Sequence, residues 1–593
     1  MAVLLASVLP AASEPAYHSP LDLRFSPDGE ILAVGDATGE RVNLLHVRSN
    51  KPMLSVPVGA SPSGLAWSAD GKGLFVAASG AGHVAEIRVS DGTVIRRMAT
   101  GRYPRGLAAA SRRNLLLACD WGLDRLHVIG LADGKSVANI PVGCQPTCVA
   151  VSPDESLAVV SHLIPATAAN DPKHASEITI VDLEKLAVRK SVRLPTGSSN
   201  ARGIAIGGDG RTAYVVHTLG RFHLPTTQLD RGWVNTNAFS VIDLASGELS
   251  ATILLDQVMK GAADPWGVAI DPEGQRLHIT LAGVHQLAVI DLKRLPEILG
   301  EDPAALANDL SALHRHGLMR RIDLPAKGPR GIDVSPNDGT IAIAGYFSGS
   351  VVLLDENGVN PQSIPLGSQT EPDLVRRGEA AFHDATLCYQ NWLSCATCHP
   401  GARSDGLNWD LLNDGIGNPK NSRSMLLSHA TPPVMSLGVR ANMETAVRAG
   451  FVHIQFTEPS TEDVEAVIAY FKSLKPVASP HLAPDGSLTA SAARGNEVFL
   501  RDSVGCAKCH PAPLFTKLGM RDVGTANPQD RGKSKYDTPT LVELWCNPPY
   551  LHDGRAATLR EVLVDHNAND RHGKVSQLSS AELDDLIEYL MSL

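Results

Sequence analysis

A short phrase returns at near-regular intervals between residues 19 and 369, and it constrains the fold more than any other feature of the chain. Its fullest form begins at Pro62 and reads Pro-Ser-Gly-Leu-Ala-Trp-Ser-Ala-Asp-Gly. The equivalent positions of the copies are Asp22, Gly64, Gly106, Cys148, Gly203, Gly267 and Gly331. Successive copies are 42, 42, 42, 55, 64 and 64 residues apart. A sustained period of this length is typical of repeat architectures, so the spacing predicts seven structural units.

Each unit reads as short apolar strands separated by Pro-Asp-Gly or Ser-Asp-Gly turns. Four such strands in about 42 residues make one blade of a β-propeller, and seven blades close a ring without a long exposed edge. A β-sandwich is the alternative, but it does not account for the fixed period. The repeat resembles the YVTN family of seven-bladed propellers over residues 19–369, which implies an all-β domain.

The extra residues in units four to six form three inserts, at 162–176, 217–237 and the helical-looking 295–318. Insertions in a repeat array map to loops. The favoured interpretation is that these polar loops dock a second domain. A metal or cofactor site on His162 and His217, or a binding place for a protein or small-molecule substrate, stays open as the alternative.

Two copies of the pattern C-x-x-C-H follow the repeat. They are Cys395-Ala-Thr-Cys398-His399 and Cys506-Ala-Lys-Cys509-His510. In c-type haem attachment the two thiols bond to the porphyrin and the adjacent imidazole binds iron. Structural zinc on the four thiolates is the alternative, but it gives no reason for a His after each pair. The motifs therefore predict two covalently bound haem c groups, with His399 and His510 as iron ligands.

Helical patterns surround each motif, and a Gly-, Asn- and Pro-rich stretch at 355–372 predicts a linker before them. The expected helices cover residues 374–383, 461–474, 492–500 and 580–593. Asn421 aligns with Asp537, an offset of 116 residues that continues without a gap to Gly450 and His566. The second half of the chain is thus a duplication, with all-α cytochrome c domains predicted at 372–476 and 484–593.

Two further phrases indicate a family. They are Tyr536-Asp-Thr-Pro-Thr-Leu and Pro549-Tyr-Leu-His-Asp-Gly-Arg-Ala-Ala-Thr-Leu, the second containing His552 and Arg555. Residues 372–593 resemble the bacterial di-haem cytochrome c peroxidases and the related enzyme that matures methylamine dehydrogenase. The resemblance implies that the C-terminal haem receives electrons from a soluble donor, such as a small cytochrome or a cupredoxin, and that the N-terminal haem meets peroxide.

The same resemblance implies further ligands. A calcium ion would lie between the domains, on Asn421 and the main-chain oxygens of Asn547 and Pro549. The C-terminal haem of the family takes a sixth ligand fourteen residues beyond the His of His-Asp-Gly, and that position here is His566. Gly450 aligns with it in the first half and cannot bind iron, so the N-terminal haem is expected to be open.

The chain also departs from the family around the N-terminal haem. The family has a Trp at the position of Ser436, a Gln at Ala446 and a Glu near Phe456, and none of these is present. The catalytic acid/base role would then fall on His453, Gln455 or Glu458. General acid/base help is worth about a hundredfold to ten-thousandfold, so the departure bears on the peroxidase rate more than on haem binding.

Composition narrows the setting of the protein. A net charge of -10 with no basic run argues against nucleic acid as a partner. Residues 1–13 resemble a remnant of a secretory signal, and no later apolar run approaches a membrane span. Because haem c is attached outside the bacterial cytoplasm, we expect a periplasmic or other extracytoplasmic location.

The five cysteines outside the motifs are expected to be buried thiols, with a disulfide at Cys388 or Cys546 as the alternative.

The sequence therefore predicts an exported, peroxidase-like di-haem oxidoreductase with an N-terminal seven-bladed propeller. Two rival hypotheses remain. One is an electron carrier with both irons closed, and the other is a propeller that recruits a protein for the haems to oxidise. Fold-level likeness does not choose among them.

Overall fold

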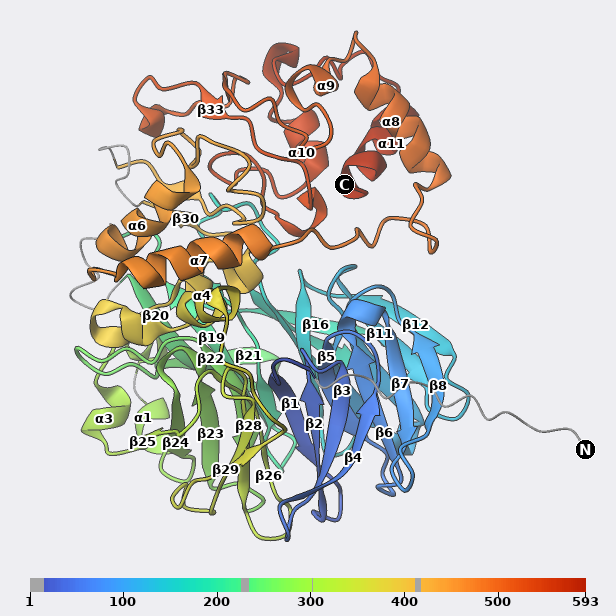
Figure 1. Cartoon of the computed structure of the whole chain (residues 1–593), viewed down its shortest axis with the longest axis vertical. Coiled ribbons are helices and arrows are strands. Elements are labelled where there is room, and N and C mark those ends of the chain that lie inside the picture. The colour runs from blue at the N-terminus through green and yellow to red at the C-terminus, as the bar shows by residue number, and fades with distance from the viewer. Residues whose placement is uncertain (1–14, 225–233, 301, 411–416) are drawn as a thin grey trace, which may run out of the picture.

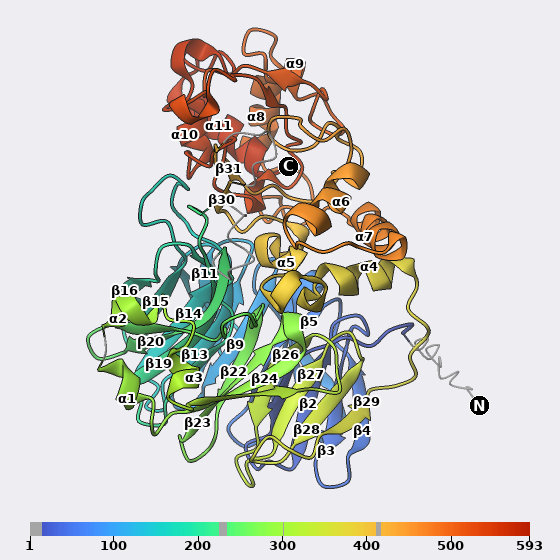
Figure 2. The same cartoon turned by 90° about the vertical axis from the view of Figure 1, so that its left-hand side faces the viewer.

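A ring of β-sheet blades forms one end of the molecule, and a helical part sits on one face of the ring (Figure 1; Figure 2). The structure is a computed structural model and describes residues 15–224, 234–300, 302–410 and 417–593. The expected signal remnant at 1–13 lies outside the described residues. The seven-bladed propeller and the helical C-terminal part are both confirmed.

Each blade is a meander of antiparallel strands in chain order. Blade one consists of β1 (Pro20–Phe25), β2 (Ile31–Asp36), β3 (Arg41–His46) and β4 (Lys51–Pro57), and blade two of β5 (Pro62–Trp67), β6 (Gly73–Ala78), β7 (His83–Arg88) and β8 (Val94–Ala99). Blade three consists of β9 (Pro104–Ala110), β10 (Leu115–Asp120), β11 (Arg125–Gly130) and β12 (Ser136–Pro141), and blade four of β13 (Pro146–Val151), β14 (Leu157–His162), β15 (Glu177–Asp182) and β16 (Ala187–Arg193). Blade five consists of β17 (Ser198–Ser199), β18 (Ile204–Ile206), β19 (Thr212–Gly220), β20 (Asn235–Asp243) and β21 (Glu248–Leu254). Blade six consists of β22 (Pro265–Ile270), β23 (Arg276–Leu281), β24 (Gln286–Asp291) and β25 (Met319–Asp323), and blade seven of β26 (Pro329–Val334), β27 (Ile341–Gly345), β28 (Ser350–Leu354) and β29 (Gln362–Pro365). In blade five, β17 and β18 both pair with β19.

The glycine of the repeated phrase lies where the first strands of neighbouring blades touch. A side chain on Gly64 would collide with the main-chain oxygen of Arg105 in the next blade, and one on Gly267 would collide with Arg330. Gly331 meets Asp22 in the same way, and this contact brings the last blade against the first. The phrase recurs because each blade must approach its neighbour closely, which only a residue without a Cβ allows.

The ring closes by packing and hydrogen bonding between blades one and seven. The main-chain nitrogen of Phe25 donates to Asp333 at 2.8 Å, and apolar residues of β1 and β2 pack in one cluster with those of β27 and β28. The stretch 355–372, expected to be a linker, contains the outer strand β29, which pairs with β28. Chain composition alone missed this strand because its residues are mostly exposed.

The inserts of the propeller point to domain docking. His174 in the first insert lies 3.1 Å from the main-chain oxygen of Gly406, and Asn237 contacts that of Trp392 in the helical part. His162 and His217 are buried and hydrogen-bonded within the propeller, and no metal-binding cluster of His, Cys, Asp or Glu occurs among the described residues. The third insert forms α1 (Pro296–Leu299), α2 (Pro303–Leu306) and α3 (Ala312–Arg315).

The helical part is built twice from the same plan. Its helices are α4 (Leu374–Phe382), α5 (Cys395–Cys398), α6 (Met443–His453), α7 (Thr461–Ser473), α8 (Ala490–Leu500), α9 (Cys506–Cys509), α10 (Leu559–Leu563) and α11 (Ser580–Met591). Helix α4 packs on α7, and α8 packs on α11. A side chain on Gly378 or Gly495 would collide with the main chain of the partner helix. The glycine after each Arg therefore permits the two close helix crossings.

Small strands confirm the internal alignment of the two halves. β30 (Asn408–Trp409) pairs with β31 (Lys420–Asn421), and β32 (Met520–Arg521) pairs with β33 (Tyr536–Asp537). The isolated bridge Val434–Arg440 returns as Tyr550–Ala556, 116 residues later. The gap-free offset of 116 read from the sequence thus holds in three dimensions.

All nine cysteines are free thiols in the structure, and Cys388 and Cys546 are buried. The disulfide alternative is not realised. In the part of the chain that the structure describes, no helix is long and apolar enough to span a bilayer.

Candidate haem-binding site

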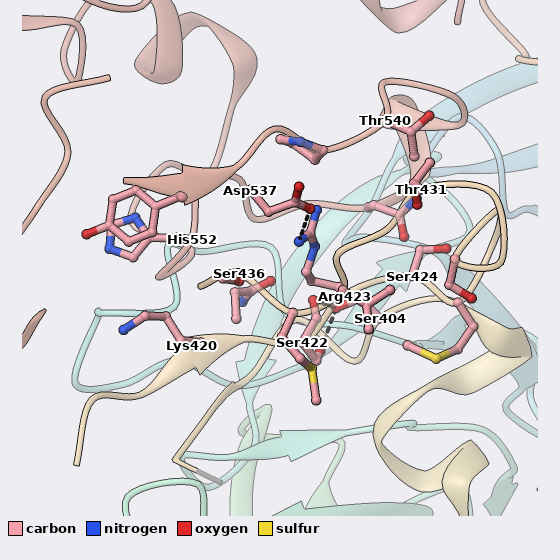
Figure 3. A pocket seen from close by; sticks show the side chains of 18 of the residues that line it. Ser404, Lys420, Ser422, Arg423, Ser424, Thr431, Ser436, Asp537, Thr540 and His552 are labelled. Atoms are coloured by element: carbon pink, nitrogen blue, oxygen red, sulfur yellow. Dashed lines mark hydrogen bonds and ion pairs between the residues drawn. The ribbon is translucent and has the colours of Figure 1, made fainter. Parts of the chain in front are cut away.

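One cavity of about 570 Å³ runs between the two halves of the helical part and reaches both C-x-x-C-H motifs. The motif side chains that line it are Cys395, Cys398, His399, Cys506, Cys509 and His510. Figure 3 shows a polar wall of this cavity, where Arg423 and Asp537 form an ion pair at 3.0 Å. These two residues come from different halves, so the wall joins the two motifs.

The propeller holds the first motif directly. Asp264, between blades five and six, accepts hydrogen bonds from Ser394 Oγ at 2.6 Å and Thr397 Oγ1 at 2.7 Å. Asn200 Nδ2 donates to the main-chain oxygen of Thr397 at 2.8 Å. Ser394 is also the N-cap of α5, with a capping box to Thr397. The helix that carries Cys395 and Cys398 is therefore capped from within and gripped by the propeller.

His399 is oriented by Arg403 of its own half, which is in turn held by the second half. The Nδ1 of His399 donates to the main-chain oxygen of Arg403 at 3.1 Å, and a bond of this kind fixes the ring orientation of a metal-binding histidine. Burial lowers the pKa of His399. The Arg403 guanidinium makes two bonds, of 2.8 and 2.7 Å, to Glu543, whose side chain is fully buried. Glu543 therefore holds Arg403 in place, and the main-chain oxygen of Arg403 orients His399.

The second motif repeats this arrangement. His510 Nδ1 donates to the main-chain oxygen of Phe515 at 2.8 Å, and burial lowers the pKa of His510. A second ring faces it, because the ring centres of His510 and His572 are 6.5 Å apart. Burial lowers the pKa of His572 to about 4, with a smaller contribution from His510.

The residues present fit haem c. Both thiols of each motif are unpaired, both imidazoles are oriented by a hydrogen bond from Nδ1 to a main-chain oxygen, and the cavity between them is lined mostly by apolar side chains. Among the described residues Phe451, Phe471, Phe499 and Leu563 contribute to this lining. Soft thiols, neutral imidazoles and apolar walls are the surroundings that a covalently bound porphyrin requires.

The three expected catalytic residues are placed very differently. Gln455 lines the cavity and is 1% exposed, and both polar atoms of its side chain lack a hydrogen-bond partner among the described residues. His453 ends α6 and is exposed, as is Glu458, and neither is among the described residues that line the cavity.

The expected sixth ligand, His566, is also outside the cavity lining. It is half-buried, and its main-chain nitrogen donates to the oxygen of Glu561 at 2.9 Å. His572 lines the cavity instead. The spacing of fourteen residues from His552 does not lead to the cavity because α10 is short and the chain after Leu563 runs in a loop.

His552 lines the cavity and stacks on Tyr536 with ring centres 3.8 Å apart (Figure 3). Its Nε2 lies 3.3 Å from a carboxylate oxygen of Asp530. Arg555 pairs with Asp553 and is not among the described cavity-lining residues. The His-Asp-Gly-Arg phrase thus forms a wall, with only its His reaching the cavity.

The expected calcium ligands Asn421, Asn547 and Pro549 all line the cavity. The side-chain nitrogen of Asn421 donates to the main-chain oxygen of Gly406 at 2.8 Å and to Asn408 Oδ1 at 3.2 Å. Asn547 Oδ1 is buried and has no partner among the described residues. The place offers neutral oxygens, which suit a hard cation but bind it weakly without carboxylates.

Several known proteins are similar to part of this chain. Hydrazine synthase subunit gamma of Kuenenia stuttgartiensis is 31% identical over 280 residues, covering 38% of this chain and 79% of that protein. Methylamine utilization protein MauG of Methylorubrum extorquens is 26% identical, covering 39% and 82%. Cytochrome c peroxidase of Escherichia coli is 23% identical, covering 42% and 64%. No family model matches the chain.

The chain belongs to the same family as hydrazine synthase subunit gamma. With the further likeness to MauG and cytochrome c peroxidase, it is a peroxidase-like haem oxidoreductase, and haem c is its cofactor. A solved chain of Kuenenia stuttgartiensis hydrazine synthase superposes with a TM-score of 0.54 and 22% identity, covering 60% of this chain and all of that one. At this identity the match supports the fold alone, and its coverage is about the length of the propeller.

Sequence reasoning missed three features of the site. Asp264 is not part of any recognised motif. The only sequence signal for a docking role was its position after an insert. Glu543 lies in a stretch without helical periodicity, so its burial was not foreseen. His572 lies six residues beyond the expected ligand, and the neighbouring Gly573 was the one local signal of a turn there.

Proposed function

We propose that this chain is an exported peroxidase-like enzyme with two covalently attached haems. Electrons enter at the haem on Cys506 and Cys509, and an oxidant such as peroxide reacts at the haem on Cys395 and Cys398. The observation that carries this proposal is the difference between the two ends of the cavity. A buried amide without a partner, Gln455, accompanies the first half, and a histidine ring faces His510 in the second.

The chain's own residues set what the first site can do. Bound haem would supply electron exchange and a coordination position for the oxidant. His399 would hold the iron, and the oxygen of Arg403 would keep its ring in one orientation. The Gln455 amide can donate a hydrogen bond to an oxygen atom in the cavity, but it cannot take up a proton. We therefore expect peroxide turnover to be slow compared with relatives that carry a carboxylate there.

The test is spectroscopic and kinetic. Optical and EPR spectra of the oxidised protein should count two haems and find one high-spin and one low-spin. Stopped-flow mixing of the reduced protein with peroxide should then oxidise both. Two low-spin haems that ignore peroxide and cyanide would contradict the proposal and favour an electron carrier.

The proposal also includes a cellular location and a bound calcium ion. Haem c attachment outside the cytoplasm, together with the apolar N-terminal residues, supports a periplasmic enzyme supplied by a small soluble cytochrome or cupredoxin. Calcium at Asn421, Asn547 and Pro549 is supported by their presence among the residues that line the cavity. Metal analysis before and after dialysis against a chelator tests it, and a protein that holds no calcium in millimolar calcium would contradict it.

A second candidate comes from two of the comparisons together. A relative that covers 38% of this chain and a solved chain that covers 60% of it both come from hydrazine synthase. This chain would then be a fused portion of a multisubunit enzyme of nitrogen compounds. Native mass measurement of the protein from its own cells distinguishes the candidates, because a subunit would be found with a partner chain and a peroxidase would not require one.

A further inference from the structure

The part of the cavity in the second helical half contains two histidine rings that lie close to each other. His510 and His572 both line the cavity. Their ring centres are 6.5 Å apart and their planes differ by 41°. Resting on the proposal that a haem is attached at Cys506 and Cys509, we infer that His572 is the second axial ligand of that haem.

The separation of the rings matches one metal ion between them. A bond from a metal to an imidazole nitrogen is about 2.0–2.1 Å, and the nitrogen is about 1.1 Å from the ring centre. Two imidazoles on opposite sides of one ion therefore have centres about 6 Å apart. His510 Nδ1 donates to the main-chain oxygen of Phe515, and a bond of this kind fixes the ring orientation of a metal-binding histidine.

The loop after α10 holds His572 in this place through the main chain. The main-chain nitrogen of His572 donates to Asn567 Oδ1 at 2.7 Å, and Asn567 Nδ2 donates to the oxygen of Gly573 at 2.8 Å. Lys574 donates its main-chain nitrogen to Val504 at 2.9 Å, two residues before Cys506. The loop is thus tied both to itself and to the attachment motif.

The side chain of His572 is half-buried, and no hydrogen bond from its Nδ1 to a described residue holds the ring in place. Its Nδ1 is buried and has no partner among the described residues. An unpaired polar atom in an apolar place is unfavourable, so a ring that is held there by its backbone and not by its own nitrogens is suited to a ligand role. The matched residue His566 lies outside the cavity lining.

Two imidazole ligands have consequences for this haem. A haem held by both His510 and His572 would supply electron transfer, and these two residues would leave no place on it for peroxide. Methionine as the second ligand raises the reduction potential, and a second histidine is expected to keep it lower. The haem would then be a stronger electron donor toward the first site than a methionine-ligated one.

The experiment uses the full-length holoprotein, with haem content measured by the pyridine haemochrome. Near-infrared magnetic circular dichroism and EPR of the wild type should show one haem with two nitrogen ligands. His572→Ala should convert this low-spin signal to high-spin, and added imidazole should restore it. His566→Ala is the matched control and should leave both spectra unchanged.

The opposite pattern overturns the inference. Loss of the low-spin signal in His566→Ala, with the signal kept in His572→Ala, would assign the ligand to His566. If His572→Ala fails to retain two haems, His572→Met must keep the haem low-spin with a methionine-type band and a raised potential. The inference is also overturned if the near-infrared band of the wild type indicates any ligand pair other than two nitrogens.

A failure of the proposed peroxidase function can be distinguished from a failure of the ligand assignment. Peroxide and cyanide report on the haem at Cys395 and Cys398. A wild type that ignores both, while the spectra follow His572, would contradict the peroxidase proposal and leave the ligand assignment intact.

Discussion

At the scale of single residues, the proposed peroxide chemistry at the first site depends most on Gln455. It is buried, it lines the cavity, and its amide is unpaired among the described residues. We expect Gln455→Ala to slow oxidation of the reduced protein by peroxide on the order of a hundredfold, because a positioned hydrogen-bond donor is lost. Stopped-flow absorbance measures this rate.

A carboxylate at the same place should have the opposite effect. Gln455→Glu supplies a group that can take up and return a proton, so the rate should rise above that of the wild type. His453→Ala is the control, because His453 is exposed and should leave the rate unchanged. A slow His453→Ala with a normal Gln455→Ala would assign the role to His453.

At the scale of elements, α5 depends on the propeller in a way that α9 does not. Its cap residues Ser394 and Thr397 both donate to Asp264, while Arg202 and Arg330 stack on Trp266 close by, at 3.7 and 4.4 Å from the ring centre. Burial raises the pKa of Asp264, and the two hydroxyl hydrogen bonds oppose this effect. The environment of the first motif is therefore set by residues of another domain.

Asp264→Asn removes a negative charge beside the first motif and keeps the shape. We expect the midpoint potential of the first haem to rise on the order of 50 mV, because reduction adds negative charge near two arginines that have lost a partner. The second haem should be unaffected. Redox titration followed at wavelengths that separate the two haems checks both values, and an equal shift of both would contradict a local effect.

At the scale of the whole molecule, a buried ion pair fastens the two haem domains together. Arg403 from the first domain pairs with Glu543 from the second, and Glu543 also accepts the main-chain nitrogen of Val477 in the connecting segment at 2.5 Å. His399 bonds to the oxygen of Arg403. The orientation of the first iron ligand is thus coupled to the way the domains meet.

Glu543→Gln leaves the Arg403 charge buried without its partner. Such a loss is expected to cost about 3–5 kcal/mol of stability, and denaturant unfolding of the haem domains measures it. Glu462→Gln is the matched control, because the pair of Arg377 and Glu462 is exposed and is worth about 0–1 kcal/mol. Equal effects of the two substitutions would show that the buried pair does not hold the domains.

The amino-acid sequence by itself determined the parts of this protein that repeat or that form covalent bonds. Seven copies of one phrase specify seven blades, because every blade must make the same close contact with the next. C-x-x-C-H specifies haem attachment, because the thiols and the imidazole are neighbours in the chain. The duplication of the helical part followed from a constant offset of 116 residues, which the paired strands and bridges confirm.

The tertiary structure alone decided which side chains meet at the haem sites. His572 rather than His566 reaches the cavity, because hydrogen bonds from Asn567 and to Val504 set the course of a loop that no periodicity describes. Gln455 is separated from its exposed neighbours His453 and Glu458 by the way the chain leaves α6. Asp264 reaches α5 across 130 residues of sequence. Such contacts depend on packing between segments far apart in the chain, which local sequence patterns do not encode.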